Sequence, residues 1–113
     1  MCPMRKISWI KQAQKEFLKF PKGARIQVET ALVIAAQGEK ADISKPLQGF
    51  GSGLFEIALQ YQTNAFRTVY ALKLDEDIWV IHAFQKKSKQ GVKTPKQDLD
   101  LIKERIKLLK RVL

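Results

Sequence analysis

The sequence predicts an α+β fold with the element order β-α-α-β-β-β-α, a twisted antiparallel sheet and helices on one face of it. Two observations support this prediction. Three runs of alternating apolar and polar residues follow one another closely in the second half of the chain, as strands joined by short loops do. Segments with helical spacing of apolar residues stand before and after them. We therefore expect a meander of three strands, with the sheet face away from the helices at least partly open.

The N-terminal third predicts one short strand and two helices. Alternation over residues 5–10 indicates a strand that joins an edge of the sheet. Helical spacing covers residues 11–20 and 22–37, and Pro21 separates the two because proline interrupts a helix. Gly38 stands at the C′ position of the second helix. The apolar stripe expected on that helix consists of Ile26, Leu32, Val33 and Ala36.

The three central strands are predicted at residues 54–61, 65–74 and 78–85, after a loop over residues 38–53. In the first strand Phe55, Ile57, Leu59 and Tyr61 share one face. In the second strand an arginine interrupts an otherwise apolar run. This residue, Arg67, falls on the face opposite Phe66 and Tyr70.

The C-terminal segment is predicted to form a helix, and its first residues carry a capping pattern. Thr94 is placed as the N-cap, Pro95 as the first helical residue and Gln97 as the third, which is a capping-box arrangement. Because the domain is small, we expect the apolar stripe of this helix to pack on its own sheet in preference to a partner. That stripe consists of Leu99, Ile102, Ile106, Leu109 and Leu113.

Composition limits the possible functions. The chain has 113 residues, 45% of them hydrophobic, which predicts a single folded domain over residues 1–113. Its net charge of +10 indicates a polyanionic partner, with nucleic acid first and an acidic protein or membrane surface second. One cysteine and one histidine exclude a disulfide framework and a zinc site. Without an apolar run of membrane-spanning length or a signal peptide, we expect a cytoplasmic protein with no cofactor.

None of the familiar catalytic motifs occurs, which leaves chemistry that needs only charge and position. Cleavage of RNA by its own 2′-hydroxyl is such a reaction, because it requires alignment, stabilisation of negative charge and proton transfer. One sheet face would carry Glu56, Gln60, Arg67 and Lys73, with Lys86 and Lys87 at the end of the next strand.

Simpler interpretations remain open for each of these residues. Glu56 and Arg67 can form a cross-strand ion pair on a solvated sheet face. The basic run at residues 86–89 can be an exposed loop or a patch that binds anions without catalysis. His82 lies mid-strand among apolar residues, and such a histidine is more often a packed core residue than a catalyst.

Three segments, LFEIALQY, AFRTVYAL and IHAFQKKSKQGVKTPKQDLDLIKERI, resemble the phage-derived, HigB-like branch of the RelE/ParE toxin superfamily. The similarity covers residues 45–107 and includes the approach KPLQGFGSGLFEI. It implies a RelE-like fold and the toxin of a type II toxin–antitoxin system. Such toxins are typically ribosome-dependent, metal-independent mRNA endonucleases that inhibit translation. The implied partners are a HigA-like antitoxin with a helix-turn-helix domain, the ribosome and mRNA.

The resemblance also implies roles for single residues. Arg67 matches the sheet arginine that contacts the scissile phosphate. Lys87, together with Lys86, matches the basic position that supports the transition state or the leaving group. Glu56 or His82 would then transfer a proton. The further basic residues expected to bind RNA are Lys73, Lys89 and Lys93.

One departure from the family keeps a second function open. RelE-type toxins often have a tyrosine or histidine near the C-terminus, whereas the last aromatic residue here is Phe84. The ParE branch shares the fold but inhibits DNA gyrase without cleaving RNA. The alternative is therefore a non-enzymatic gyrase inhibitor or a basic nucleic-acid-binding module, although the KKSK run favours RNA.

Overall fold

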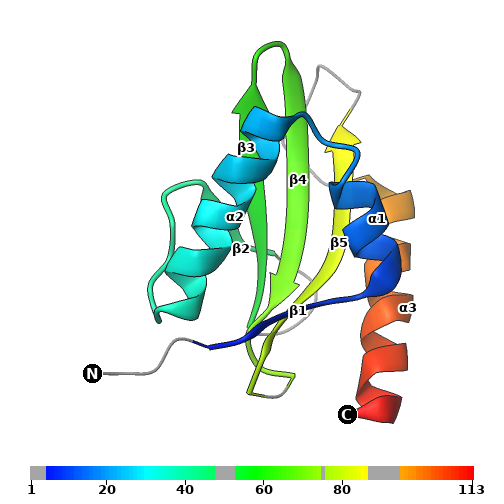
Figure 1. Ribbon diagram of the computed structural model, residues 1–113. Coiled ribbons are helices and arrows are strands. Elements are labelled where there is room, and N and C mark those ends of the chain that lie inside the picture. Colours follow the sequence, from blue (N-terminus) through cyan, green and yellow to red (C-terminus); the bar gives the residue numbers. More distant parts are fainter. Residues whose placement is uncertain (1–4, 48–52, 75, 87–94) are drawn as a thin grey trace.

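The computed structural model describes residues 5–47, 53–74, 76–86 and 95–113, with Lys86 described by its backbone alone. The elements in chain order are β1 (Ile7–Trp9), α1 (Lys11–Phe17), α2 (Lys22–Ala36), β2 (Ser44–Pro46), β3 (Leu54–Tyr61), β4 (Asn64–Ala71), β5 (Ile78–Lys86) and α3 (Lys96–Val112) (Figure 1). The α+β class and the central meander of β3, β4 and β5 are confirmed.

The sheet has the strand order β1-β5-β4-β3-β2, and its two edge strands differ from the prediction. β1 joins the edge as expected but runs parallel to β5, so the sheet is mixed. Alternation identifies a strand without giving its direction, which pairing with β5 decides. β2 lies within the predicted loop and pairs with β3 at the other edge. Its Pro46 is tolerated there because an edge strand needs no donor on its outer side.

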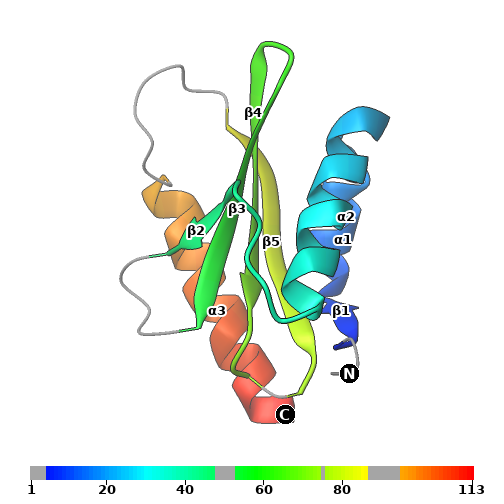
Figure 2. The ribbon, with the colours of Figure 1, turned by 90° about the vertical axis from the view of Figure 1, so that its left-hand side faces the viewer.

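Helices cover both faces of the sheet, which corrects the prediction of helices on one face. Figure 2 shows α1 and α2 on one side of the strands and α3 on the other. The physical reason is that the central strands are apolar on both faces over part of their length. Ile57 and Phe66 pack in the cluster under α1 and α2, whereas Val69 and Ala71 pack with Ile102 of α3.

The core face of α2 differs from the predicted stripe. Leu32 and Ala36 are buried as expected, but the side chains of Ile26 and Val33 are 53% and 37% exposed. Small residues dominate the buried face, which lets the helix lie close to the sheet. That face consists of Ala24, Val28, Ala31, Leu32, Ala35 and Ala36. Gly38 has φ +91° after the last turn, which confirms its predicted role as the C′ residue.

A β-bulge in β5 decides which face carries the histidine. Val69 pairs with His82 but the next residue, Tyr70, pairs with Val80, so Ile81 is the extra residue. Strict alternation from Val80 would return His82 to the α1 and α2 side. The bulge instead puts His82 in register with Val69 on the α3 side. The histidine thereby leaves the apolar core for the face that α3 covers.

The start of α3 also departs from the prediction. The helix begins at Lys96, Pro95 occupies the N-cap position, and no side chain among the described residues makes a cap hydrogen bond. Thr94 lies outside the described residues. Within the predicted stripe Ile102 and Leu109 are buried, whereas Leu113 is 51% exposed. Among the helices that the structure describes, none combines the length and the hydropathy of a membrane span.

Candidate functional site

On the α3 side of the sheet the strand register sets residues in rows that cross β3, β4 and β5. Three consecutive rows run from the middle of the sheet towards the β3–β4 turn. They are Glu56–Val69–His82, then Ala58–Arg67–Phe84, then Gln60–Ala65–Lys86. The predicted site residues Glu56, Arg67 and His82 therefore lie in adjacent rows.

Arg67 is held by a buried ion pair. Its Nη1 donates a hydrogen bond to Oε1 of Glu56 over 3.4 Å. The side chains of Arg67 and Glu56 are 10% and 1% exposed. The predicted cross-strand ion pair therefore exists, but it is buried and does not lie on a solvated sheet face. A buried carboxylate fixes the guanidinium without using all five of its N–H donors. The ion pair therefore holds the positive charge of Arg67 in a fixed position in the second row.

Phe84 stands beside Arg67 on the neighbouring strand, in direct register with it. Its half-buried ring stacks against the ring of His82, with centroids 5.1 Å apart and planes inclined by 25°. Ala58 flanks Arg67 on its other side and is also half-buried. The second row thus combines a small residue, a cation and a partly accessible aromatic ring, at the border of the area that α3 covers.

His82 is 1% exposed and both of its ring nitrogens have partners. Nη1 of Arg105 donates to Nδ1 over 2.9 Å, and Nε2 lies 2.7 Å from Oδ1 of Asp98. A guanidinium can only donate, so Nδ1 accepts and Nε2 carries the hydrogen that it donates to Asp98. Since both nitrogens are engaged, His82 connects the sheet to α3. It is neither an apolar core residue nor open to a substrate.

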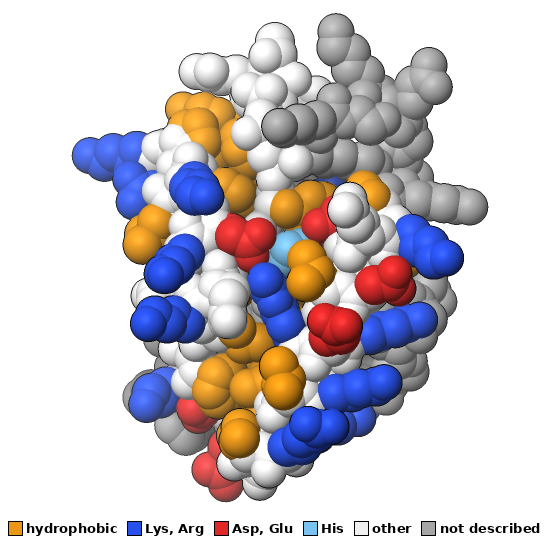
Figure 3. All heavy atoms as spheres, turned by 90° about the vertical axis from the view of Figure 1, so that its right-hand side faces the viewer, with side chains coloured by type: hydrophobic (Ala, Val, Ile, Leu, Met, Phe, Trp, Pro, Cys, Tyr) orange, Lys and Arg blue, Asp and Glu red, His pale blue; other side chains and the backbone are white. Residues whose placement is uncertain are grey.

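Arg105 extends this polar network to α1. Its Nη1 shares two hydrogens among three acceptors, which are Nδ1 of His82, Oε1 of Glu16 at 3.1 Å and the carbonyl oxygen of Ile81 at 3.0 Å. The network therefore joins α1, β5 and α3 at the point where β1 no longer covers the edge of β5. Figure 3 shows the histidine in the hollow between α1 and α3, among acidic and basic side chains.

The sequence reasoning missed Glu16, Asp98 and Arg105. For two of these residues the sequence carries a pattern that could have identified them. Asp98 and Arg105 are seven residues apart on α3, so they share one face of the helix. The buried residues Ile102 and Leu109 lie on the same face. Charges within a packing face indicate a polar network beneath the helix. Glu16 had no such signal.

The structure separates Lys73 from Arg67 and Phe84. It is exposed and follows β4, whose last residue, Ala71, is in the row beyond Val69. Lys73 lines a small hollow with Gly53, Ile106 and Lys110, at the other end of α3 from Phe84. Lys86 ends β5 in register with Ala65. The remaining predicted RNA-binding or catalytic residues, Lys87, Lys89 and Lys93, lie outside the described residues.

Comparisons with known proteins identify the family and the fold of the chain. The family model described as "Phage derived protein Gp49-like (DUF891)" matches residues 15–107. A structure of the Escherichia coli toxin RelE, an arginine-to-alanine double mutant in the free state, has the same fold. Its TM-score is 0.64 at 19% sequence identity, over 98% of this chain and 100% of that chain. The resemblance to phage-derived toxins of the RelE superfamily is thereby confirmed.

No curated protein matches the sequence significantly.

Proposed function

Because the chain belongs to the Gp49-like family of phage-derived proteins, we propose that it is the toxin of a toxin–antitoxin pair and acts by cleaving mRNA on the ribosome. The observation that best supports cleavage is Arg67, a fixed cation beside the half-buried ring of Phe84. A phosphodiester needs a positive charge, and an unpaired base needs a flat apolar surface for stacking. The second row offers both next to each other.

In this proposal one nucleotide of the message stacks on Phe84 while its phosphate contacts Arg67. The guanidinium matches the geometry of phosphate oxygens and binds them through paired hydrogen bonds. Ala58 is in register with Arg67, and its small side chain leaves room for a phosphate to approach the guanidinium. Since Glu56 already orients the guanidinium, little reorganisation is needed when negative charge builds on phosphorus.

The reaction joins the 2′-oxygen to phosphorus and breaks the bond from phosphorus to the 5′-oxygen. The products are a 2′,3′-cyclic phosphate and a 5′-hydroxyl end, so one proton leaves the 2′-hydroxyl and one reaches the 5′-oxygen. The proton from the 2′-hydroxyl passes to solvent water, and the proton for the 5′-oxygen comes from Lys86, which ends β5, or from Lys87, the next residue in the sequence. Glu56 and His82 act as positioning residues, because Glu56 is bonded to Arg67 and both nitrogens of His82 are engaged.

Charge supports the ribosome as the place of action. The net charge of +10 favours binding to ribosomal RNA, and the reaction as written draws its positive charge from arginine and lysine without a metal ion. The same charge favours an acidic antitoxin. We propose a HigA-like antitoxin with a helix-turn-helix domain as the cognate partner.

The test is translation of a reporter message followed by primer extension to map breaks. Arg67→Ala is expected to slow cleavage by about a hundredfold or more, as loss of a charge-stabilising donor does in other enzymes. Arg25→Ala is the matched control, because Arg25 is a partly buried arginine of α2 on the other side of the sheet. It should cleave at the wild-type rate. Breaks should appear only when ribosomes are present.

Cleavage that persists in the Arg67→Ala/Lys87→Ala double variant would remove both residues from the mechanism. Intact messages together with inhibited DNA supercoiling would instead assign the chain to gyrase inhibition. Circular dichroism of each variant separates loss of activity from loss of fold.

A further inference from the structure

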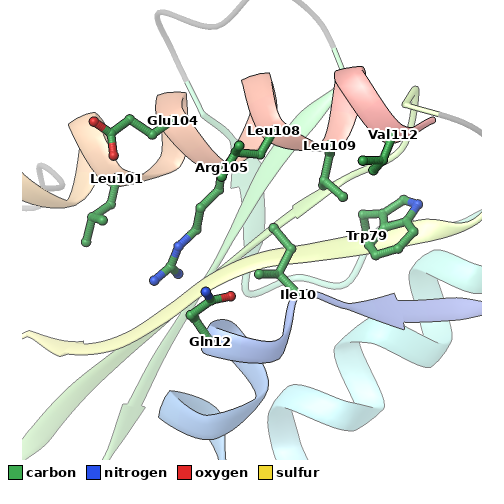
Figure 4. Close-up of a pocket in the computed structure, with 9 residues that line it drawn as sticks. All are labelled: Ile10, Gln12, Trp79, Leu101, Glu104, Arg105, Leu108, Leu109 and Val112. Atoms are coloured by element: carbon green, nitrogen blue, oxygen red, sulfur yellow. The ribbon is translucent and has the colours of Figure 1, made fainter.

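An apolar groove runs between α3 and the start of α1, away from Arg67 and Phe84. It has a volume of about 500 Å³, and its apolar walls include Ile10, Trp79 and Leu108. Figure 4 shows α3 along one side, Ile10 and Gln12 along the other, and Trp79 of β5 at the base. Arg105, whose side chain belongs to the His82 network, also lines the groove.

α3 exposes an apolar line to this groove. Leu101, Leu108 and Val112 are 37%, 58% and 79% exposed, and they lie at positions i, i+7 and i+11. At 1.5 Å per residue this line is about 16 Å long, or about three helical turns. An exposed apolar surface of this kind is typical of protein interaction sites. Its length and straightness fit a second helix lying alongside α3.

Basic side chains stand on both flanks of the groove. On the α1 side Lys11 and Lys15 are exposed, and on the outer side of α3 Lys107 and Arg111 are exposed. Glu104 of α3 is also exposed and lines the groove itself, so cations outnumber it on the flanks. Figure 3 shows blue side chains on either side of the apolar surface between the two helices. A helix seated in the groove would therefore place its own flanks against cations.

We propose that this groove binds an amphipathic helix of a partner protein, with leucine-type residues on one face and acidic residues on both flanks. Burial of the apolar face would supply affinity, and the lysine and arginine flanks would select the acidic partner. The proposal goes beyond RNA cleavage and uses none of the residues assigned to it.

The charge of the chain argues against the other occupants. A second copy would bring its own basic flanks against those of the first, in a protein of net charge +10. RNA would meet an apolar floor formed by Ile10, Leu108 and Trp79 instead of hydrogen-bonding groups. A lipid surface is flat and would not fill a groove between two helices.

The test uses the whole chain and a synthetic helical peptide as long as α3, with leucines at i, i+3, i+4 and i+7 and glutamates on both flanks. Binding is measured by fluorescence anisotropy of the labelled peptide, without RNA or ribosomes, so the result does not depend on cleavage. We expect saturable binding, and a second peptide with lysines in place of the glutamates should not bind.

Two variants test the surface. Leu108→Asp and Lys107→Glu/Arg111→Glu should each weaken binding by about tenfold or more, as expected for an interface centre and its charged rim. Ile26→Asp is the matched control, since Ile26 is 53% exposed on α2 and does not line the groove. It should change the affinity by less than about twofold.

Several results would overturn the proposal. Equal binding of the two peptides, or equal loss in Leu108→Asp and Ile26→Asp, would remove the groove as the recognition site. Self-association in sedimentation that Leu108→Asp abolishes would assign the groove to a second copy. Binding to vesicles of anionic lipid that Leu108→Asp abolishes would assign it to a membrane.

Discussion

The two faces of the sheet bury different kinds of side chain. Under α1 and α2 the described core is mainly apolar, and its buried polar side chains are the hydroxyls of Ser44 and Thr68. Aromatic rings such as Phe17, Phe20 and Phe66 contact one another there in a chain. Under α3 a smaller apolar cluster adjoins the buried polar residues Glu56, Arg67 and His82. The first face can therefore supply most of the hydrophobic stabilisation, because burial of apolar area is its main source.

This difference shows how one small domain holds a charged site. Buried ionic groups contribute little net stability, since desolvation offsets their attraction. Here each is paired with a residue of another element, such as Glu56 with Arg67 and His82 with Asp98. The apolar face provides the stability that lets the other face carry charge in a fixed geometry.

The largest effect should come from one isoleucine on each face. Ile57 and Ile102 are both 0% exposed, Ile57 under α1 and α2 and Ile102 on α3. Ile57→Ala should lower the free energy of unfolding by about 3–5 kcal/mol, and Ile102→Ala by about 2–3 kcal/mol. The Ile57 cavity is flanked on both sides by hydrogen-bonded strands, β2 and β4, whereas α3 can shift towards the sheet and partly fill the Ile102 cavity. Urea denaturation measures both values.

Equal losses of unfolding free energy in Ile57→Ala and Ile102→Ala would show that the two faces of the sheet contribute equally to stability. That result would contradict the difference between the faces described above.

The next effect concerns the ion pair. Glu56→Ala leaves Arg67 with a buried charge that has lost its carboxylate, and should cost about 2–3 kcal/mol. This is less than for a fully buried pair, because the Arg67 side chain is 10% exposed. The double variant Glu56→Leu/Arg67→Met should recover wild-type stability to within about 1 kcal/mol. Urea denaturation again gives the stability, and the cleavage assay gives the activity.

Both ion-pair variants should be inactive in RNA cleavage. A stable and active Glu56→Leu/Arg67→Met protein would show that the pair serves the fold alone.

The smallest effect appears only at high pH and belongs to the apolar face. Burial raises the pKa of the Tyr70 phenol above its ordinary value. The folded protein thus holds this proton more tightly than the unfolded chain does. The stabilisation is fully present below about pH 10 and is lost as pH rises through the raised pKa. Tyr70→Phe should remove this part of the pH dependence, measured by urea denaturation on both sides of pH 10.

If wild type and Tyr70→Phe lost stability in parallel, the phenol would not be the group that titrates.

Much of the fold follows from local pattern. The β3 bounds agree with the alternation of LFEIALQY, and both central turns fall where polar residues interrupt the apolar runs. Gly38 ends α2 because its φ of +91° is one that glycine adopts without strain. The pairing of Glu56 with Arg67 could also be predicted from the sequence. Side chains alternate between the two faces of a strand, and this alternation places both residues on one face of neighbouring strands.

By itself the sequence determined the order of the elements apart from β2, the faces of β3 and β4 and the proximity of Glu56 to Arg67, because these depend on neighbours along the chain. Tertiary structure alone decided that α3 covers the face carrying that pair, that a bulge turns His82 towards Asp98, and that Glu16 meets Arg105. Those contacts join α1, β5 and α3, and their geometry depends on how helices pack against the sheet. No local periodicity encodes that packing.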